Sequence, residues 1–215
     1  MYRRPLIFVV TGERGSGKST VCARVARETA QQGLAVAGIL TERTDSDDPR
    51  GMRKVIDLQT GEERAFGSQE KSRRRSAQRP VKGTVPTSLL HETDKLRADV
   101  SVDHTSTSDP LTPGWRFDPD VFFWANEVLT RSIPCDLLIV DEVGPLELLG
   151  GRGWAKATEV LRSSGYHAAL VVCRFALLDE LRRILGSRPS VVVEVTPETR
   201  DLIPTAIMER IQSPH

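Results

Sequence analysis

The sequence has few of the residues that would mark it as a disulfide-stabilised or zinc-binding protein. Among 215 residues there are three cysteines, Cys22, Cys135 and Cys173, and no C-x-x-C pair. A sparse, odd number of cysteines favours buried thiols in a reducing compartment over a disulfide framework or a zinc site. The four histidines also lack the spacing of a metal-ligand set. These absences argue against a zinc site and against a secreted disulfide scaffold.

The sequence also lacks an excess of charge of one sign and long hydrophobic runs. The 30 Lys and Arg residues nearly balance the 29 Asp and Glu residues, so composition gives no clear signal for a nucleic-acid or membrane-surface partner. No apolar run approaches the roughly 18 residues of a membrane helix. The start resembles a signal peptide, with two arginines before residues 6–10, but that apolar stretch is too short. We interpret it as the first core strand of a cytoplasmic protein.

The segment "TGERGSGKST", residues 11–20, follows that strand and has the spacing G-x-x-x-x-G-K-S. This is a phosphate-binding loop, or Walker A motif, in which glycines let backbone N–H groups approach phosphate oxygens. Lys18 is expected to reach the β- and γ-phosphates, and the Ser19 hydroxyl to bind Mg²⁺. The helical spacing after Ser19 supports this interpretation over an ordinary glycine-rich turn. The predicted nucleotide-binding residues are Gly12, Glu13, Arg14, Gly15, Ser16, Gly17, Lys18, Ser19 and Thr20.

A second candidate motif is "LLIVDEVG", an apolar strand that ends in two carboxylates. Asp141 is the expected Mg²⁺ partner at the end of a buried strand. Glu142, directly after it, is our candidate general base, which would take a proton from a water molecule aimed at the γ-phosphate. With Lys18, it forms the predicted catalytic pair. The alternative is that the two acids cap a strand or form a solvated turn, and Glu147 is the next candidate base.

Arginine side chains could supply positive charge to the transition state. Arg174, after an apolar strand, and Arg200, in "PETRD", are candidates by position alone. An ordinary surface cation is an equally good interpretation of each. Arg73, Arg74 and Arg75 could clamp nucleotide phosphates as a kinase lid does, but a solvated basic run explains them at least as well.

The pattern of elements predicts an α/β protein with one domain over residues 1–215. Strand-like and helix-like segments alternate, which favours a mainly parallel sheet with helices on both faces. Residues 52–66, with a Thr-Gly turn, predict an added β-hairpin. Predicted strands cover 6–10, 34–40, 135–144, 168–173 and 190–195, and predicted helices 19–32, 118–132, 153–165, 177–186 and 196–212, the last interrupted at Pro204.

Residues 67–113 differ from the rest in composition. They are poor in aliphatic side chains and rich in Ser, Thr, Arg and Asp. A segment of this length without clear elements is usually a mobile insertion or a functional lid.

Several segments together resemble the thermophilic and cancer-related nucleoside-triphosphatase family. They are "VVTGERGSGKST", "GILTERTDSDDPRGMRKVIDLQTGEERAF", "GWRFDPDVFFWANEVL", "LLIVDEVGPLELL" and "VTPETRDLIP", in the family's order and outside about 67–113. The resemblance implies a three-layer P-loop NTPase fold and slow, Mg²⁺-dependent hydrolysis of ATP, GTP and other nucleoside triphosphates. It also implies nucleotide binding at Gly12 to Thr20 and a catalytic role for Glu142. The sequence departs from the family pattern in two places, the acidic loop after Thr41 and residues 67–113, for which we find no family counterpart.

Two other functions remain open at this point. A small-molecule or nucleoside kinase would use residues 67–113 as lid and acceptor site, but a water-activating glutamate argues against it. A nucleotide-dependent switch or assembly factor would bind a partner in its triphosphate state. A guanine-specific switch usually carries an N-K-x-D motif, which this sequence lacks.

Replacing residues 67–113 with a short Gly/Ser linker is expected to leave the unfolding midpoint nearly unchanged. The segment offers little apolar surface to offset the entropy cost of ordering its backbone. Chemical denaturation of the two proteins compares their midpoints directly. A large loss of stability would show that the segment packs against the core.

Overall fold

The computed structural model describes residues 5–44, 51–69 and 110–212, and these form one eight-stranded sheet in the order β5-β4-β3-β2-β6-β7-β1-β8. The strands β2, β6, β7, β1 and β8 are parallel to one another, whereas β3, β4 and β5 extend the sheet from β2 in antiparallel pairs. The strands are β1 (Leu6–Thr11), β2 (Val36–Arg43), β3 (Arg53–Asp57), β4 (Glu63–Gln69), β5 (Trp115–Phe117), β6 (Cys135–Val143), β7 (Tyr166–Cys173) and β8 (Ser190–Glu194).

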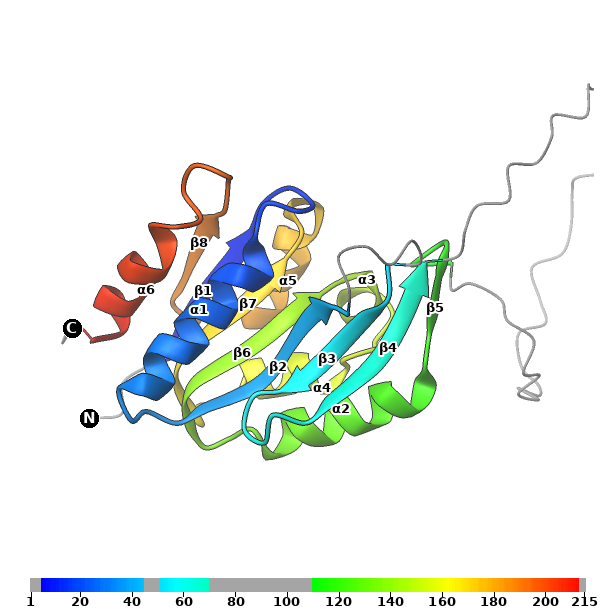
Figure 1. The fold of residues 1–215 in the computed structure, drawn as a ribbon, viewed down its shortest axis with the longest axis horizontal. Helices are drawn as coiled ribbons and strands as arrows, with labels where there is room; N and C mark the ends of the chain where they lie inside the picture. Colours follow the sequence, from blue (N-terminus) through cyan, green and yellow to red (C-terminus); the bar gives the residue numbers. More distant parts are fainter. Residues whose placement is uncertain (1–4, 45–50, 70–109, 213–215) are drawn as a thin grey trace, which may run out of the picture.

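Helices cover both faces of the sheet (Figure 1), which confirms the predicted three-layer fold class. One face carries α1 and α6, which pack against each other, and the opposite face carries α2, α4 and α5. The helices are α1 (Lys18–Gln31), α2 (Pro119–Arg131), α3 (Pro145–Leu148), α4 (Lys156–Leu161), α5 (Leu178–Leu185) and α6 (Ile203–Gln212), with a 3₁₀ turn η1 (Phe175–Leu177).

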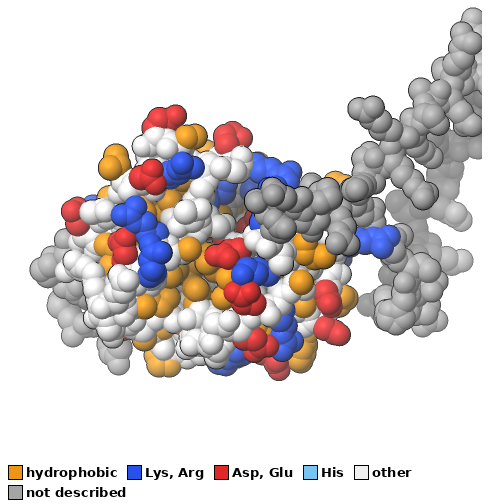
Figure 2. Space-filling view, viewed as in Figure 1, with side chains coloured by type: hydrophobic (Ala, Val, Ile, Leu, Met, Phe, Trp, Pro, Cys, Tyr) orange, Lys and Arg blue, Asp and Glu red, His pale blue; other side chains and the backbone are white. Residues whose placement is uncertain are grey.

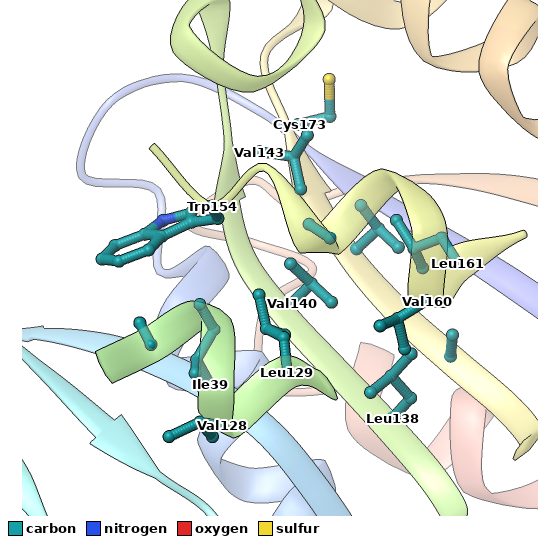
Figure 3. Close-up of a cluster of buried hydrophobic side chains, with 14 of the residues drawn as sticks. Ile39, Val128, Leu129, Leu138, Val140, Val143, Trp154, Val160, Leu161 and Cys173 are labelled. Atoms are coloured by element: carbon teal, nitrogen blue, oxygen red, sulfur yellow. The ribbon is translucent and has the colours of Figure 1, made fainter. Parts of the chain in front are cut away.

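The buried side chains form two hydrophobic clusters, one on each face of the sheet. In β6, Leu138 and Val140 belong to the cluster under α2 and α4, while Leu137 and Ile139 belong to the cluster under α1 and α6. Figure 3 shows the first cluster, with Val140 among side chains from α2 and α4. Because β6 is buried on both faces, its sequence is a continuous apolar run rather than an alternating one.

The antiparallel extension contains the predicted hairpin and one strand that the sequence did not indicate. β3 and β4 pair as predicted around a turn in which Gly61 has a φ of 75°. β5 then pairs with β4, with Gln69 opposite Trp115. Residues 67–69, assigned above to the polar segment, are therefore part of β4, and a linker replacement has to spare them. Residues 70–109 lie outside the described residues.

The prediction of a helix over 196–212 is wrong in where the helix starts and in the interruption at Pro204. Residues 196–202 form turns, and α6 begins at Ile203. Pro204 therefore lies in the first helical turn, where its missing N–H group breaks no intrahelical hydrogen bond. The predicted helix over 153–165 is shorter than expected, and the short α3 was not predicted at all.

The distribution of surface charge and the burial of the cysteines agree with what the composition predicts. The face seen in Figure 2 carries acidic and basic side chains interspersed with each other. The cysteines Cys22, Cys135 and Cys173 are all buried and free, as expected for structural thiols. In the ranges that the structure describes, no helix is long and apolar enough to span a membrane.

Gly38→Ala is expected to lower the free energy of unfolding by about 2–4 kcal/mol. Gly38 lies in β2 with a φ of +107°, and a Cβ atom there would lie 2.0 Å from the carbonyl oxygen of Ile139. Gly33→Ala is the matched control, because its φ is +79° but no atom lies within 4 Å of the added Cβ. Urea unfolding of both variants tests the difference, and equal losses would contradict it.

Candidate functional site

The phosphate loop connects β1 to α1, as its sequence predicts. Gly12, Gly15 and Gly17 have φ angles of 141°, 83° and 103°, which side chains with a Cβ rarely adopt. A Cβ atom at Gly12 would also lie 2.3 Å from the carbonyl oxygen of Val195. Gly17 is the N-cap residue of α1, so the positive end of this helix adjoins the loop. The loop thus has the backbone shape and the electrostatics of an anion site.

Lys18 is the first residue of α1, and its side chain reaches back across the phosphate loop. Its Nζ donates hydrogen bonds to the carbonyl oxygens of Gly12, at 2.9 Å, and Glu13, at 2.7 Å. Burial lowers the pKa of Lys18, while the negative charges of Glu142 and Asp141 raise it in part. The two carboxylates of the second motif therefore lie within electrostatic reach of the phosphate loop.

Asp141 is fully buried at the end of β6. Its Oδ2 accepts hydrogen bonds from the backbone N–H of Thr41 at 3.0 Å and from the Thr41 hydroxyl at 2.9 Å. Burial and the adjacent charge of Glu142 raise the pKa of Asp141 to about 6, although Thr41 and the Ser19 hydroxyl counteract them. The Oδ1 atom is buried and has no hydrogen-bond partner in the described part of the chain.

The oxygens of Asp141 and Ser19 have the chemistry that a Mg²⁺ ion requires. This hard cation is usually bound by one or two protein oxygens, and it completes its coordination with phosphates and water. The described ranges contain no group of three or more His, Cys, Asp or Glu side chains that could hold a metal, so they offer no all-protein cage. A buried carboxylate oxygen without a partner, near a hydroxyl, fits a cation that arrives with a nucleotide.

Glu142 lies in a β-bulge. Val140 pairs with Val171 and Val143 pairs with Cys173, so β6 has one residue more than β7 over this interval. Glu142 has a φ of 66° and is the non-glycine residue with positive φ in the described part of the chain. Such a conformation costs about 1–2 kcal/mol. The bulge re-aims the side chain at a strand end, and strained conformations of this kind gather at functional sites.

Glu147, the second candidate base, has a structural position. Its Oε2 accepts a hydrogen bond from the N–H of Gly144 and its Oε1 one from the N–H of Trp154, both at 2.8 Å. Burial raises the pKa of this carboxyl group. Both oxygens thus hold the backbone on either side of α3, at Gly144 before it and at Trp154 after it, which makes Glu147 a poorer base candidate than Glu142.

The order of the strands brings two predicted arginines to the site. β7 lies between β1, which precedes the phosphate loop, and β6, which carries the acidic pair (Figure 1). Arg174 directly follows β7, and its charge contributes to lowering the pKa of Lys18. Arg200 lies against the other side of the loop, where its Cδ is 3.3 Å from the position of a Cβ atom at Gly17. Residues 73–75 lie outside the described residues.

Comparisons with known proteins identify the family of the chain. The model of the NTPase family matches residues 7–93 and 122–208. The chain belongs to the NTPase family. This confirms the predicted family and the prediction that the chain is a nucleoside-triphosphatase. The match runs to residue 93, so the expectation that residues 67–113 have no family counterpart is wrong for residues 67–93.

Two relatives of this NTPase cover 96% and 82% of its length. It is 26% identical over 208 residues to nucleoside-triphosphatase THEP1 of Methanosarcina barkeri, covering 96% of this chain and 98% of the relative. It is 29% identical over 178 residues to the THEP1 of Thermococcus kodakarensis, covering 82% and 81%.

Two solved structures have the same fold as this NTPase. A human cancer-related nucleoside triphosphatase has a TM-score of 0.59 at 19% identity, over 99% of this chain and 100% of the other. THEP1 from Aquifex aeolicus has a TM-score of 0.59 at 20% identity, over 96% and 99%.

Two site residues of this NTPase were missed by sequence reasoning. Thr41, at the end of the "GILTER" strand, holds Asp141, and Arg53, at the start of the hairpin, forms an ion pair with Glu142. Thr41 has a sequence signal, because it is a hydroxyl residue at the carboxyl end of an apolar strand, as Asp141 is. Arg53 has none, because one arginine among many in a polar stretch carries no local pattern.

Lys18→Ala is expected to abolish most nucleotide binding while the fold stays intact, because the charge of Lys18 serves the loop rather than the core. Equilibrium binding of a non-hydrolysable ATP analogue measures the effect, with the unfolding midpoint as the check on folding. Lys156→Ala is a matched control, since Lys156 pairs with Glu159 on α4, on the opposite face of the sheet from α1. Unchanged affinity in a folded Lys18→Ala variant would contradict the phosphate-loop assignment.

Proposed function

We propose that the chain hydrolyses ATP, GTP and related nucleoside triphosphates to the diphosphate and inorganic phosphate in a Mg²⁺-dependent reaction. The observation that carries the proposal is the meeting of two motifs at one edge of the sheet. Lys18, in the phosphate loop, lies within reach of the charges of Asp141 and Glu142, although more than a hundred residues separate them. A phosphate-binding loop beside a buried acid and a second, half-exposed acid is the arrangement that water-dependent phosphoryl transfer requires.

Each residue has a separate role in this reaction. The backbone of residues 12–20 binds the phosphates, and Lys18 moves from the loop carbonyls to the β- and γ-phosphate oxygens. Ser19 and Asp141 hold Mg²⁺, which when bound neutralises charge on the phosphate oxygens. Arg174 adds positive charge from the strand end between the two motifs.

Glu142 acts on the attacking water. One carboxylate oxygen takes a proton from the water as the water oxygen forms a bond to the γ-phosphorus. The bond from the γ-phosphorus to the β–γ bridging oxygen breaks, and the nucleoside diphosphate leaves with that electron pair. The exposed fraction of the Glu142 side chain, 39%, leaves room for a water molecule.

Phosphate release from a panel of nucleoside triphosphates, with and without Mg²⁺ and with and without candidate acceptors, tests the proposal. We expect release from several triphosphates, dependent on Mg²⁺ and independent of any acceptor. Diphosphate formation that requires an acceptor would instead identify a kinase. Binding without turnover, even after long incubation, would favour a nucleotide-dependent switch.

Glu142→Gln is expected to keep ATP and Mg²⁺ binding and to lower kcat by about 10²- to 10⁴-fold. The amide keeps the shape of the carboxylate but cannot accept the proton. KM is expected to change little where it reflects binding. Steady-state phosphate release and analogue binding measure the two effects separately.

Asp141→Asn is the informative companion to this variant. It removes a negative charge at the metal position, so it is expected to raise the Mg²⁺ concentration needed for half-maximal rate as well as to lower turnover. A Glu142→Gln protein that hydrolyses ATP at the original rate would contradict the proposed mechanism.

A further inference from the structure

Glu142 is held by a side chain from the antiparallel extension. Nη1 of Arg53, in β3, donates a hydrogen bond to Oε1 of Glu142 at 2.6 Å. The Arg53 side chain is 17% exposed, less than half the value for Glu142, so the ion pair is partly shielded from water. We propose that Arg53 is a positioning residue for hydrolysis, which fixes one oxygen of Glu142 so that the other faces the attacking water. This inference rests on the proposed role of Glu142 as the general base.

The Glu142 side chain needs a partner to fix its carboxylate, because the backbone sets only the direction in which the side chain leaves the strand. A glutamate has three rotatable side-chain bonds, and a general base has to lie within about 2.6–3.2 Å of the proton that it takes. Within the described ranges, Arg53 is the side chain that forms a hydrogen bond and an ion pair with the Glu142 carboxylate. Oε1 is engaged by it, which leaves Oε2 to act as the base.

Arg53 is itself fixed in place. Its guanidinium carbon lies 5.5 Å from the centre of the Trp115 ring of β5, within the range of a cation–π contact. The main chain of β3 pairs with β2, with Arg53 opposite Arg43 and Val55 opposite Thr41. An arginine held by an aromatic ring and by a sheet is a more precise support than one on a free loop.

The same pair of strands supports both carboxylates of the site. β2 supplies Thr41, which holds Asp141, and β3 supplies Arg53, which holds Glu142. A positive charge at this place also offsets the repulsion between the two adjacent acids. The antiparallel extension therefore does more than widen the sheet, because it sets the geometry of the acidic pair.

A brake is the opposite interpretation of the same contact. If Arg53 occupied the oxygen that the reaction needs, removing it would speed hydrolysis. The monodentate geometry favours positioning, since one Nη atom engages one oxygen. The two interpretations predict rate changes of opposite sign.

Arg53→Gln tests the inference. We expect kcat to fall about 10- to 100-fold, since small misplacements of a catalytic group have effects of this size. KM and the affinity for a non-hydrolysable ATP analogue are expected to stay within about twofold, because Arg53 acts on Glu142 and not on the phosphate loop. Arg53→Lys, which keeps the charge, is expected to recover part of the lost rate.

Lys54→Gln is the matched control. Lys54 is the next residue of β3, but it pairs with Glu63 and Glu42 instead of the site. The kcat of the Lys54→Gln variant is expected to match that of the unchanged protein. Unfolding midpoints of all variants show whether β3 has kept its structure, and Arg53→Met serves as a second neutral variant if Arg53→Gln does not fold.

The double variant Arg53→Gln/Glu142→Gln separates this inference from the proposed function. If Arg53 acts through Glu142, the double variant is expected to be no slower than Glu142→Gln alone. If the single variant Glu142→Gln is inactive but the single variant Arg53→Gln hydrolyses ATP at the normal rate or faster, the positioning role is overturned and the proposed function stays in place. Unimpaired hydrolysis by Glu142→Gln would instead remove the proposed function itself.

Discussion

The burial of the Asp141 carboxylate is the constraint to which the rest of the site is adapted. A buried carboxylate is unfavourable unless it is hydrogen-bonded or bound to a cation, and here a second acid follows it directly. Thr41 satisfies one oxygen, and the other is left without a partner in the described residues. Burial and the adjacent charge of Glu142 raise the pKa of Asp141 to about 6, so the folded protein keeps an unfavourable charge, or a protonated acid, in its core.

The bulge in β6 follows from that constraint. In a regular strand, adjacent side chains point to opposite faces of the sheet, so Asp141 and Glu142 could not both serve one site. The extra residue and the positive φ of Glu142 break this alternation. The insertion of β7 between β1 and β6 then sets the spacing between the acidic pair and the phosphate loop. The strain is local, and the hydrogen-bonded strands on either side of β6 maintain it.

The sequence predicted those parts of the molecule whose signals are local. The phosphate loop, the apolar strands and the hairpin each have a pattern within about fifteen residues, and the structure has them. The three-residue β5 is too short to show a hydrophobic period. Pro204 predicts a helix interruption but lies in the first turn of α6, because proline inside a helix and proline in its first turn look alike in sequence. The partners Thr41–Asp141 and Arg53–Glu142 join residues 100 and 89 positions apart, so only the sheet topology brings them together.

The antiparallel extension links the site to a part of the chain far from the phosphate loop in sequence. The chain leaves the described residues after Gln69 and returns at Pro110, and Gln69 is paired with Trp115. The Trp115 ring in turn forms a cation–π contact with Arg53, which donates a hydrogen bond to Glu142. A displacement of β5 against β4 would therefore reach the acidic pair through two side chains, without any change in the phosphate loop. With the proposed role of Glu142, nucleotide binding and turnover depend on different strands of one sheet, and a change in this extension is expected to alter kcat independently of affinity.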